Sequence, residues 1–180
     1  ALALNFELIP TSTMSYATDR LIRDIVRRGN HLSTGFVGTM HLLPALTKGG
    51  ATAMAYRLLR QQSFPSWLYP VTQGATTMWE RWDSWHHEFG LQTPTMNSFN
   101  HFAYGCVGDW MMRTMIGICD HPDAPGFRTA LIAPQPGGDL SYAKGSYTSQ
   151  FGTYKSGWKI KGNLLQLDVS IPAGCSAEVQ

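Results

Sequence analysis

The stretch Asp120-His-Pro-Asp-Ala-Pro-Gly126 divides the chain into two parts with different sequence patterns. Before it, apolar residues recur at the spacing of amphipathic helices, and after it they alternate as they do in strands. Because proline and glycine at this density interrupt regular structure, we place a domain boundary here. The sequence therefore predicts a helical domain over residues 1–124 and a β-sheet domain over residues 127–180.

Upstream of this boundary, the sequence predicts helices separated by one long irregular segment. Thr13 can cap a first helix that runs to Arg28, where Gly29-Asn30 ends it. Further helices are expected over residues 35–46, 51–62 and 99–118, with a short one possible at 75–82. Residues 63–98 hold four of the six tryptophans and no long helical period, and a loop of this length is usually functional.

Downstream of the boundary, the pattern is that of short strands. They are expected over residues 127–133, 140–149, 153–161 and 164–171, and again from residue 178. Gly162-Asn163 lies between two of these runs and is a hairpin signal. The odd positions of residues 165–171 should point inward. Four or five short antiparallel strands of this kind indicate a sheet or half of a sandwich.

Composition and charge restrict the kind of partner. Charged residues make up 14% of the chain, against ~25% in typical soluble domains, whereas aromatic residues make up 12%. Fourteen basic and twelve acidic residues give a net charge of +2, which is too balanced for an electrostatic nucleic-acid binder, since such a protein needs a basic stripe. No apolar run reaches 18 residues, so we expect no transmembrane helix and no membrane partner. A neutral, hydroxyl-rich partner fits this composition best.

We expect the chain to be an internal segment of a longer protein. It begins without methionine or a basic leader, and it stops within an expected strand. The few expected helices have apolar faces that need partners, which we place upstream. The compartment is left open, because any targeting signal would lie outside this sequence. The three cysteines are an odd number without a CxxC motif and make no complete disulfide framework, and we expect Cys106 and Cys119 to be small buried apolar residues.

Among only four glutamates, Glu80 stands out because Trp79 and Trp82 flank it. A carboxylate between two tryptophans can lie in a walled cleft and act as a general base on water. The alternative is structural: Glu80 pairs with Arg81 or caps a short helix. Spacing alone leaves both interpretations open.

His101 lies at the start of an otherwise apolar helical run, near Asn97 and Asn100. It can be a hydrogen-bonded core residue or a donor to a sugar hydroxyl, and amides, imidazoles and aromatic faces together are typical of sites for neutral sugars. The adjacent residues His86 and His87 point apart in any regular structure, so we expect no metal site.

Several of these motifs, taken in order, resemble the bacterial α-L-rhamnosidases of glycoside hydrolase family 78. The resemblance extends from about residue 30 to the end of the chain. It rests on Thr34-Gly-Phe-Val-Gly-Thr39, Pro65-Ser-Trp-Leu-Tyr69, Gly74-Ala-Thr-Thr-Met-Trp-Glu-Arg-Trp82, Met96-Asn-Ser-Phe-Asn-His-Phe-Ala-Tyr-Gly105 and Pro134-Gln-Pro-Gly-Gly138. It implies an α+β multidomain fragment, in which part of an (α/α)6 toroid is followed by an antiparallel β-sandwich segment.

The resemblance also implies roles for individual residues. Glu80 becomes the general base of an inverting hydrolase that removes terminal α-L-rhamnosyl groups without a cofactor. The residues expected to contact the substrate are His101, Trp79, Trp67 and Asn100. Glu80, Trp79 and His101 should therefore face one cleft.

The family's general acid lies in an upstream motif that this sequence lacks. The isolated segment should therefore be inactive, and its partners should be a rhamnose-containing glycoside and the rest of its own parent chain. Two alternatives stay open. One is another (α/α)6 glycosidase, such as an unsaturated glucuronyl hydrolase or a trehalase-like enzyme. The other is a non-catalytic carbohydrate-binding or scaffold protein, against which the presence of Glu80 argues.

Overall fold

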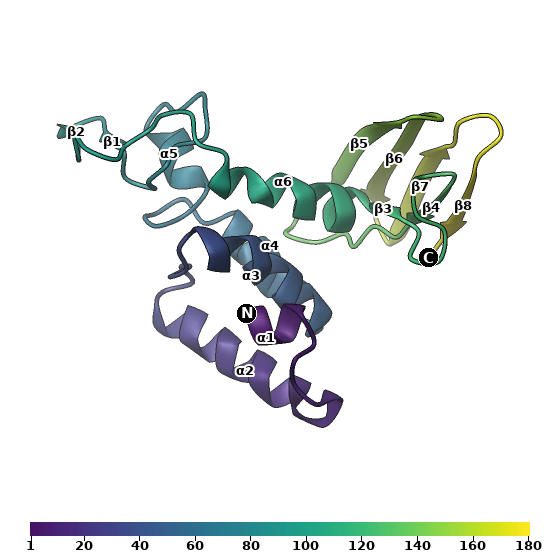
Figure 1. Cartoon of the computed structure of the whole chain (residues 1–180), viewed down its shortest axis with the longest axis horizontal. Coiled ribbons are helices and arrows are strands. Elements are labelled where there is room, and N and C mark those ends of the chain that lie inside the picture. The colour runs from purple at the N-terminus through teal and green to yellow at the C-terminus, as the bar shows by residue number, and fades with distance from the viewer. The chain divides into compact units, whose positions relative to one another are not determined.

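The computed structural model describes all residues 1–180 and divides them into two compact units, Ala1–Val107 and Gly108–Gln180 (Figure 1). The boundary predicted near residues 124–127 falls inside the second unit. There the Pro/Gly-rich stretch is the short connection between two antiparallel strands, β3 (Ile118–Asp120) and β4 (Thr129–Ile132). The stretch therefore marks a turn within the second unit, because proline and glycine interrupt a strand as readily as they form a linker.

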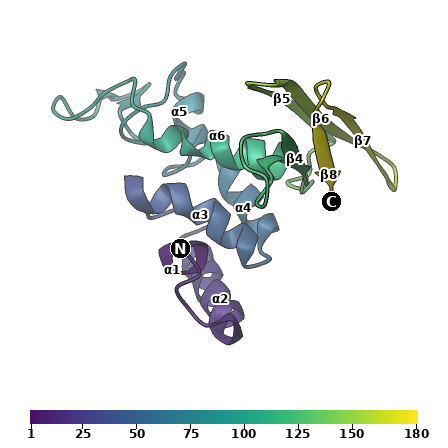
Figure 2. The same cartoon turned by 45° about the vertical axis from the view of Figure 1, so that its right-hand side comes forward.

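The first unit is built from five α-helices, one short 3₁₀ helix and an irregular aromatic segment. Its helices are α1 (Leu2–Asn5), α2 (Thr11–Arg27), α3 (Phe36–Lys48), α4 (Thr52–Leu59) and α5 (Leu68–Thr72). Helix α3 is central, since it contacts α1, α4 and the 3₁₀ helix η1 (Ala103–Cys106) (Figures 1 and 2). A Cβ atom on Gly49, directly after α3, would lie 2.3 Å from the hydroxyl oxygen of Thr18 in α2, so only glycine permits this approach.

The ends of α2 show where turn chemistry was predicted correctly and where it was not. Gly29 and Asn30 end the helix with positive φ angles of 69° and 62°, as predicted. The helix begins at Thr11, however, and Thr13 is not its cap. The Thr13 hydroxyl instead donates a hydrogen bond to the carbonyl of Pro10, within the first turn. The prediction of a Thr13 cap was wrong because Pro10 already supplies the fixed φ of a helix start.

No helix forms over residues 75–82, contrary to the prediction. The backbone there pairs with a distant segment, because the N–H of Glu80 donates to the carbonyl of Ser98 and the N–H of His101 donates to the carbonyl of Met78. These long-range bonds use groups that a helix would have used locally. The rest of the aromatic segment contains α5 and a minimal hairpin, β1 (Trp85–His86) and β2 (Gly90–Leu91).

The helix predicted over residues 99–118 is shorter and changes its winding along its length. After η1 come the α-helical turn α6 (Val107–Trp110) and the π-helical segment η2 (Met111–Ile116). Gly117 ends the run with a φ of 82°. A Cβ atom on Gly117 would lie 2.2 Å from the backbone nitrogen of Pro134, so this turn requires glycine. Strand β3 follows at once, and its first residue, Ile118, is the last residue of the predicted helix.

The second unit contains two three-stranded sheets. One is β3–β4–β8, where β8 is Ser176–Val179, and the other is β5 (Tyr142–Ser149), β6 (Gly152–Lys161) and β7 (Leu164–Ser170) (Figure 1). Gly162-Asn163 forms the predicted two-residue hairpin between β6 and β7. Strands β4 and β8 are parallel, contrary to the expectation of antiparallel strands only. The whole β5–β6–β7 sheet lies between them in sequence and supplies the long crossover that parallel pairing requires.

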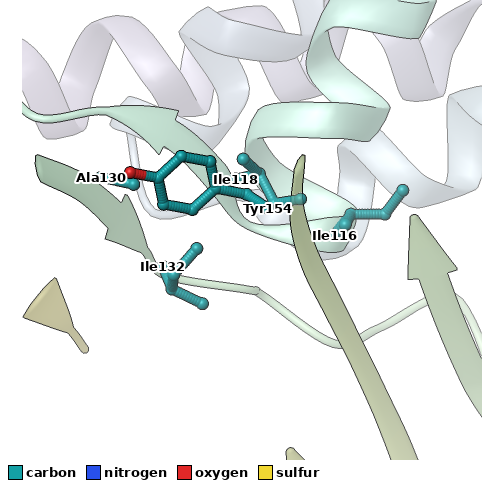
Figure 3. Close-up of a cluster of buried hydrophobic side chains, with 5 residues drawn as sticks. All are labelled: Ile116, Ile118, Ala130, Ile132 and Tyr154. Atoms are coloured by element: carbon teal, nitrogen blue, oxygen red, sulfur yellow. The ribbon is translucent and has the colours of Figure 1, made fainter. Parts of the chain in front are cut away.

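The core of the second unit lies against one face of the β5–β6–β7 sheet. It contains Ile116, Ile118, Ala130, Ile132 and Tyr154 (Figure 3). The Tyr154 hydroxyl donates to the carbonyl of Phe127 at 2.7 Å, and the indole N–H of the buried Trp158 donates to the carbonyl of Met115 at 2.6 Å. These buried polar groups are therefore paired, as burial requires.

The predicted inward alternation of residues 165–171 holds only in part. Leu167 and Val169 are half-buried, but Leu165 and Ile171 are 53% and 39% exposed. Leu165 lies directly opposite Ile160, which is 41% exposed. The apolar side chains do alternate as predicted, but at this end of the face they are only partly covered by the rest of the chain.

Candidate active site

The carboxylate of Glu80 is held at the junction of two segments that are distant in sequence. Its Oε2 accepts a hydrogen bond of 2.8 Å from the backbone N–H of Ser98. The N–H of Glu80 donates in turn to the Ser98 carbonyl at 2.8 Å. The backbone of both residues thus fixes the direction of the side chain, and Oε1 accepts no hydrogen bond from the chain. Glu80 forms no ion pair with Arg81, whose guanidinium contacts Asp83 at 3.4 Å.

Glu80 lines a pocket with a volume of about 440 Å³. Most of the other lining side chains are aromatic or apolar, and two are charged. The full set comprises Phe36, Phe64, Glu80, Arg81, Trp82, Asp83, Met96 and Tyr104. A pocket with apolar walls and a few directed polar groups is the usual form of a small-ligand site.

Stacked rings form the wall and floor of this pocket. The rings of Trp82 and Tyr104 stack with centroids 3.6 Å apart, and Phe36 meets Tyr104 edge to face at 5.1 Å. Burial raises the pKa of the Tyr104 phenol, so it stays a neutral hydrogen-bond donor across the physiological range. The wall is therefore uncharged beside the Glu80 carboxylate.

His101 joins this aromatic wall through Phe36. The imidazole stacks on the Phe36 ring, with centroids 4.9 Å apart. Its Nδ1 accepts a hydrogen bond of 3.3 Å from the N–H of Ala103. In the neutral ring, the proton is then on Nε2, which can donate to a ligand hydroxyl.

The other predicted contact residues lie elsewhere in the same unit. Trp79 is buried edge to face against Phe99, and Trp67 is buried with its indole N–H donating to the Tyr104 carbonyl at 2.9 Å. Neither lines the pocket. Asn100 is exposed and also lies outside the lining. His101 is also absent from the lining and is connected to the pocket through its contact with Phe36. Of the predicted site residues, only Glu80 lines the pocket, and the expectation that Glu80, Trp79 and His101 face one cleft does not hold for Trp79.

Two polar residues that the sequence did not single out position Glu80. Ser98 supplies the bond to the carboxylate, and Asn97 holds the loop before it. The Asn97 amide donates to the carbonyls of Ser84 and Thr93, at 3.2 and 2.7 Å. A signal for Asn97 was present in the sequence, since asparagine side chains in loops often bond nearby backbone groups. The bond from Ser98 is made by the backbone and had no side-chain signal.

The histidine pair lies on the β1–β2 hairpin. The two side chains do not point apart as expected, because this hairpin is too short and irregular to impose a strand alternation, and their imidazoles stack 4.8 Å apart. His86 accepts from the N–H of Glu88, and His87 bonds the amide oxygen of Gln73 in another segment. No three histidine, cysteine or acidic side chains gather anywhere in the chain as metal ligands would.

Comparison with known sequences settles the family. Residues 1–115 match the profile of the bacterial α-L-rhamnosidase six-hairpin glycosidase domain, and residues 117–180 match the bacterial α-L-rhamnosidase C-terminal domain. The chain belongs to the bacterial α-L-rhamnosidase family. Its fold is accordingly part of a six-hairpin toroid followed by part of the C-terminal β domain.

Individual relatives agree along nearly the whole chain. An α-L-rhamnosidase from Streptomyces avermitilis is 47% identical over 178 residues, which are 99% of this chain and 17% of that protein. Its crystal structure in complex with L-rhamnose matches with a TM-score of 0.92. The α-L-rhamnosidase of Aspergillus terreus is 36% identical, with a TM-score of 0.92, over 99% of this chain and 21% of that one. The chain thus spans about a fifth of the length of these rhamnosidases.

Proposed function

We propose that this chain supplies the general base, Glu80, to an inverting α-L-rhamnosidase. The substrate is a glycoside with a terminal α-L-rhamnosyl group. The single observation that carries the proposal is the hydrogen bonding of the Glu80 carboxylate. One oxygen accepts a bond from the Ser98 N–H, and the other accepts none from the chain and lies at an aromatic pocket.

This arrangement suits a base that acts on water. The bond from Ser98 orients the carboxylate, and the unpaired Oε1 can accept a proton from a water molecule. The partner carboxylic acid protonates the leaving oxygen from the opposite side of the sugar, so inversion needs two carboxyl groups roughly 6.5–9.5 Å apart. No second glutamate or aspartate of suitable placement lines this pocket, since Asp83 is paired with Arg81. The acid therefore comes from the rest of the parent chain.

The pocket fits a neutral deoxysugar better than a uronic acid. Its aromatic wall can stack on sugar C–H groups, and His101, which contacts the lining residue Phe36, can donate from Nε2 to a hydroxyl of a sugar that extends beyond the pocket. Arg81 is the one cation in the lining, and Asp83 already neutralises it. This observation disfavours the glucuronyl hydrolase alternative, which needs an unpaired cation for the substrate carboxylate.

No helix of the chain has both the length and the apolar character to cross a bilayer.

The test uses a chimera, because the chain spans only 17% of its Streptomyces relative. The matching segment of that enzyme is replaced by this chain, and hydrolysis of 4-nitrophenyl α-L-rhamnoside is followed by absorbance. Glu80→Gln should lower kcat by ~10²–10⁴-fold with little change in KM, because it removes the base and keeps the side-chain shape.

Glu88→Gln is the matched control. It makes the same chemical change at an exposed position on the β1–β2 hairpin, outside the pocket. It should retain the activity of the unsubstituted chimera. If Glu80→Gln left the kcat of the chimera unchanged, Glu80 would not be the base. If the chimera hydrolysed 4-nitrophenyl glucuronide faster than the rhamnoside, the proposal of a rhamnosyl substrate would be wrong.

A further inference from the structure

The second unit carries a concentrated positive charge that the proposed hydrolysis does not use. Four of the five lysines of the chain lie between residues 144 and 161. Strand pairing places them all on one face of the β5–β6–β7 sheet, opposite the face that carries Tyr154 and Trp158. Asp168 is the one acidic residue within the three strands.

Three of these lysines surround a gap in the sheet surface. Lys155 and Lys159 lie two residues before and after Gly157 on β6, and Lys144 lies directly opposite Gly157 on β5. Gly157 has no side chain, so the three lysines, with Tyr142 and Asp168 beside them, enclose a hollow of about 670 Å³. We call this hollow the lysine groove.

The groove has no partner for its charge within the chain. None of its three lysines forms an ion pair, and the Asp168 carboxylate instead accepts from the Gln166 amide, at 3.2 and 3.4 Å. Like charges at diagonal cross-strand positions are roughly 7–8 Å apart and repel each other. An anion among them would remove this repulsion, so the arrangement favours an anionic ligand.

We propose that the lysine groove binds an acidic oligosaccharide, one that carries carboxylate or sulfate groups on its sugar units. The ammonium groups of Lys144, Lys155 and Lys159 would contact the anionic groups. The ring of Tyr142, which is 61% exposed, offers a face for a pyranose ring to stack upon. Asp168 can accept hydrogen bonds from sugar hydroxyls.

The mixture of charges favours a carbohydrate over a nucleic acid. A nucleic-acid backbone presents charged phosphate oxygens and few hydroxyl groups, so the Asp168 carboxylate in the same hollow would find little to bind and would repel it. An oligosaccharide presents both charged groups and hydroxyls, which matches lysines beside a carboxylate and a tyrosine. The choice of a carbohydrate also rests on the proposed function, because a glycosidase acts on carbohydrate chains.

The first test is a titration of the ¹⁵N-labelled 180-residue chain, followed by NMR. The probe is tetragalacturonate, with neutral maltotetraose as the matched sugar and tripolyphosphate as the matched anion. We expect saturable shifts of the Lys144, Gly157 and Asp168 amides with tetragalacturonate alone, weakening as salt rises. Equal binding of maltotetraose would overturn the role of charge, and tighter binding of tripolyphosphate would overturn the carbohydrate.

Substitutions locate the site. Lys144→Gln or Lys159→Gln should each weaken tetragalacturonate binding about tenfold, the usual value of a hydrogen bond to a charged group. Lys161→Gln makes the same change on the same strand and face but outside the groove, and should leave the Kd within a factor of two. Equal effects of all three substitutions would mean diffuse attraction to the sheet and would contradict a defined groove.

The chimera gives a second measurement that does not depend on how the isolated chain behaves. Its retention on immobilised polygalacturonate is measured beside its hydrolysis of the aryl rhamnoside. Retention without hydrolysis would overturn the proposed function and keep the groove. Hydrolysis without retention would overturn the groove and keep the proposed function.

Discussion

The segment around Glu80 and the β5–β6–β7 sheet are both rich in aromatic residues, but they hold them in opposite ways. In the sheet, a regular backbone sets the direction of every side chain, so Tyr154 and Trp158 point into the core at every second position. Around Glu80, the backbone has almost no regular structure. There the stacked rings of Trp82 and Tyr104 and the amide of Asn97 hold the loops in place.

The two regions should therefore respond differently to substitution. The sheet depends on buried area, so the loss of one large side chain should cost stability. The Glu80 segment depends on a few directed bonds, so the loss of one polar group should cost activity first. The predictions below test that division.

The largest expected effect on stability is that of Trp158→Ala in the sheet. Trp158 is fully buried and bonds the Met115 carbonyl, so the substitution leaves both a cavity and an unpaired acceptor. We expect a loss of ~3–5 kcal/mol in the free energy of unfolding of the second unit. Urea denaturation of the chain, followed by circular dichroism, measures it.

Ile160→Ala on the same strand is the control. Ile160 is 41% exposed, so its truncation should cost less than ~1 kcal/mol. If both variants lost the same stability, burial on this face would not decide the stability of the sheet.

An intermediate effect is expected for Asn97→Ala, tested in the chimera. Loss of the bonds to Ser84 and Thr93 frees the loop that carries the Ser98 N–H to Glu80. We expect kcat to fall about tenfold with KM nearly unchanged, because the base is misplaced and the pocket wall is intact.

Two comparisons separate this positioning role from general destabilisation. Thr95→Ala alters the same exposed loop without removing a hydrogen bond and should leave kcat unchanged. Combined with Glu80→Gln, Asn97→Ala should have no further effect on kcat. A full additional tenfold loss in the double variant would show that Asn97 acts on something other than Glu80.

The smallest effect concerns alkaline pH. Burial, with a smaller effect of Cys175, raises the pKa of Tyr154 from 10.0 to about 12. A raised pKa in the folded chain stabilises it fully below pH 10 and progressively less from pH 10 to about 12. At neutral pH, Tyr154→Phe should be less stable than the unsubstituted chain by ~1 kcal/mol, because the bond to Phe127 is lost. Above pH 10, the unsubstituted chain should lose more stability than the variant, because the variant has no phenol to ionise. If the free energies of unfolding of the two proteins changed equally between neutral pH and pH values above 10, the raised pKa of Tyr154 would be contradicted.

The same contrast explains what the sequence could predict. The strands of the second unit, their hairpin at Gly162-Asn163 and the helix end at Gly29-Asn30 follow from local periodicity and turn chemistry. The parallel pairing of β4 with β8 does not, because it joins segments more than forty residues apart. A period-2 pattern specifies a strand and its inward face but carries no information about its neighbour.

Around Glu80, the sequence identified the motif but did not predict how the carboxylate is held. The resemblance of Trp79-Glu80-Arg81-Trp82 to a rhamnosidase motif singled out the carboxylate. The bond from Ser98 is a long-range backbone contact, and it displaced the short helix expected over residues 75–82. The burial of Trp67 and Trp79 also depends on tertiary contacts, which sequence spacing does not specify.

The central claim is that Glu80 activates water and does not itself attack the sugar. The anomeric configuration of the rhamnose first released by the chimera from 4-nitrophenyl α-L-rhamnoside tests it most directly. A ¹H NMR time course, recorded faster than mutarotation, should show β-L-rhamnose first, because water activated by Glu80 attacks opposite the leaving group. Release of α-L-rhamnose first would instead make Glu80 a nucleophile in a retaining reaction and would contradict the account.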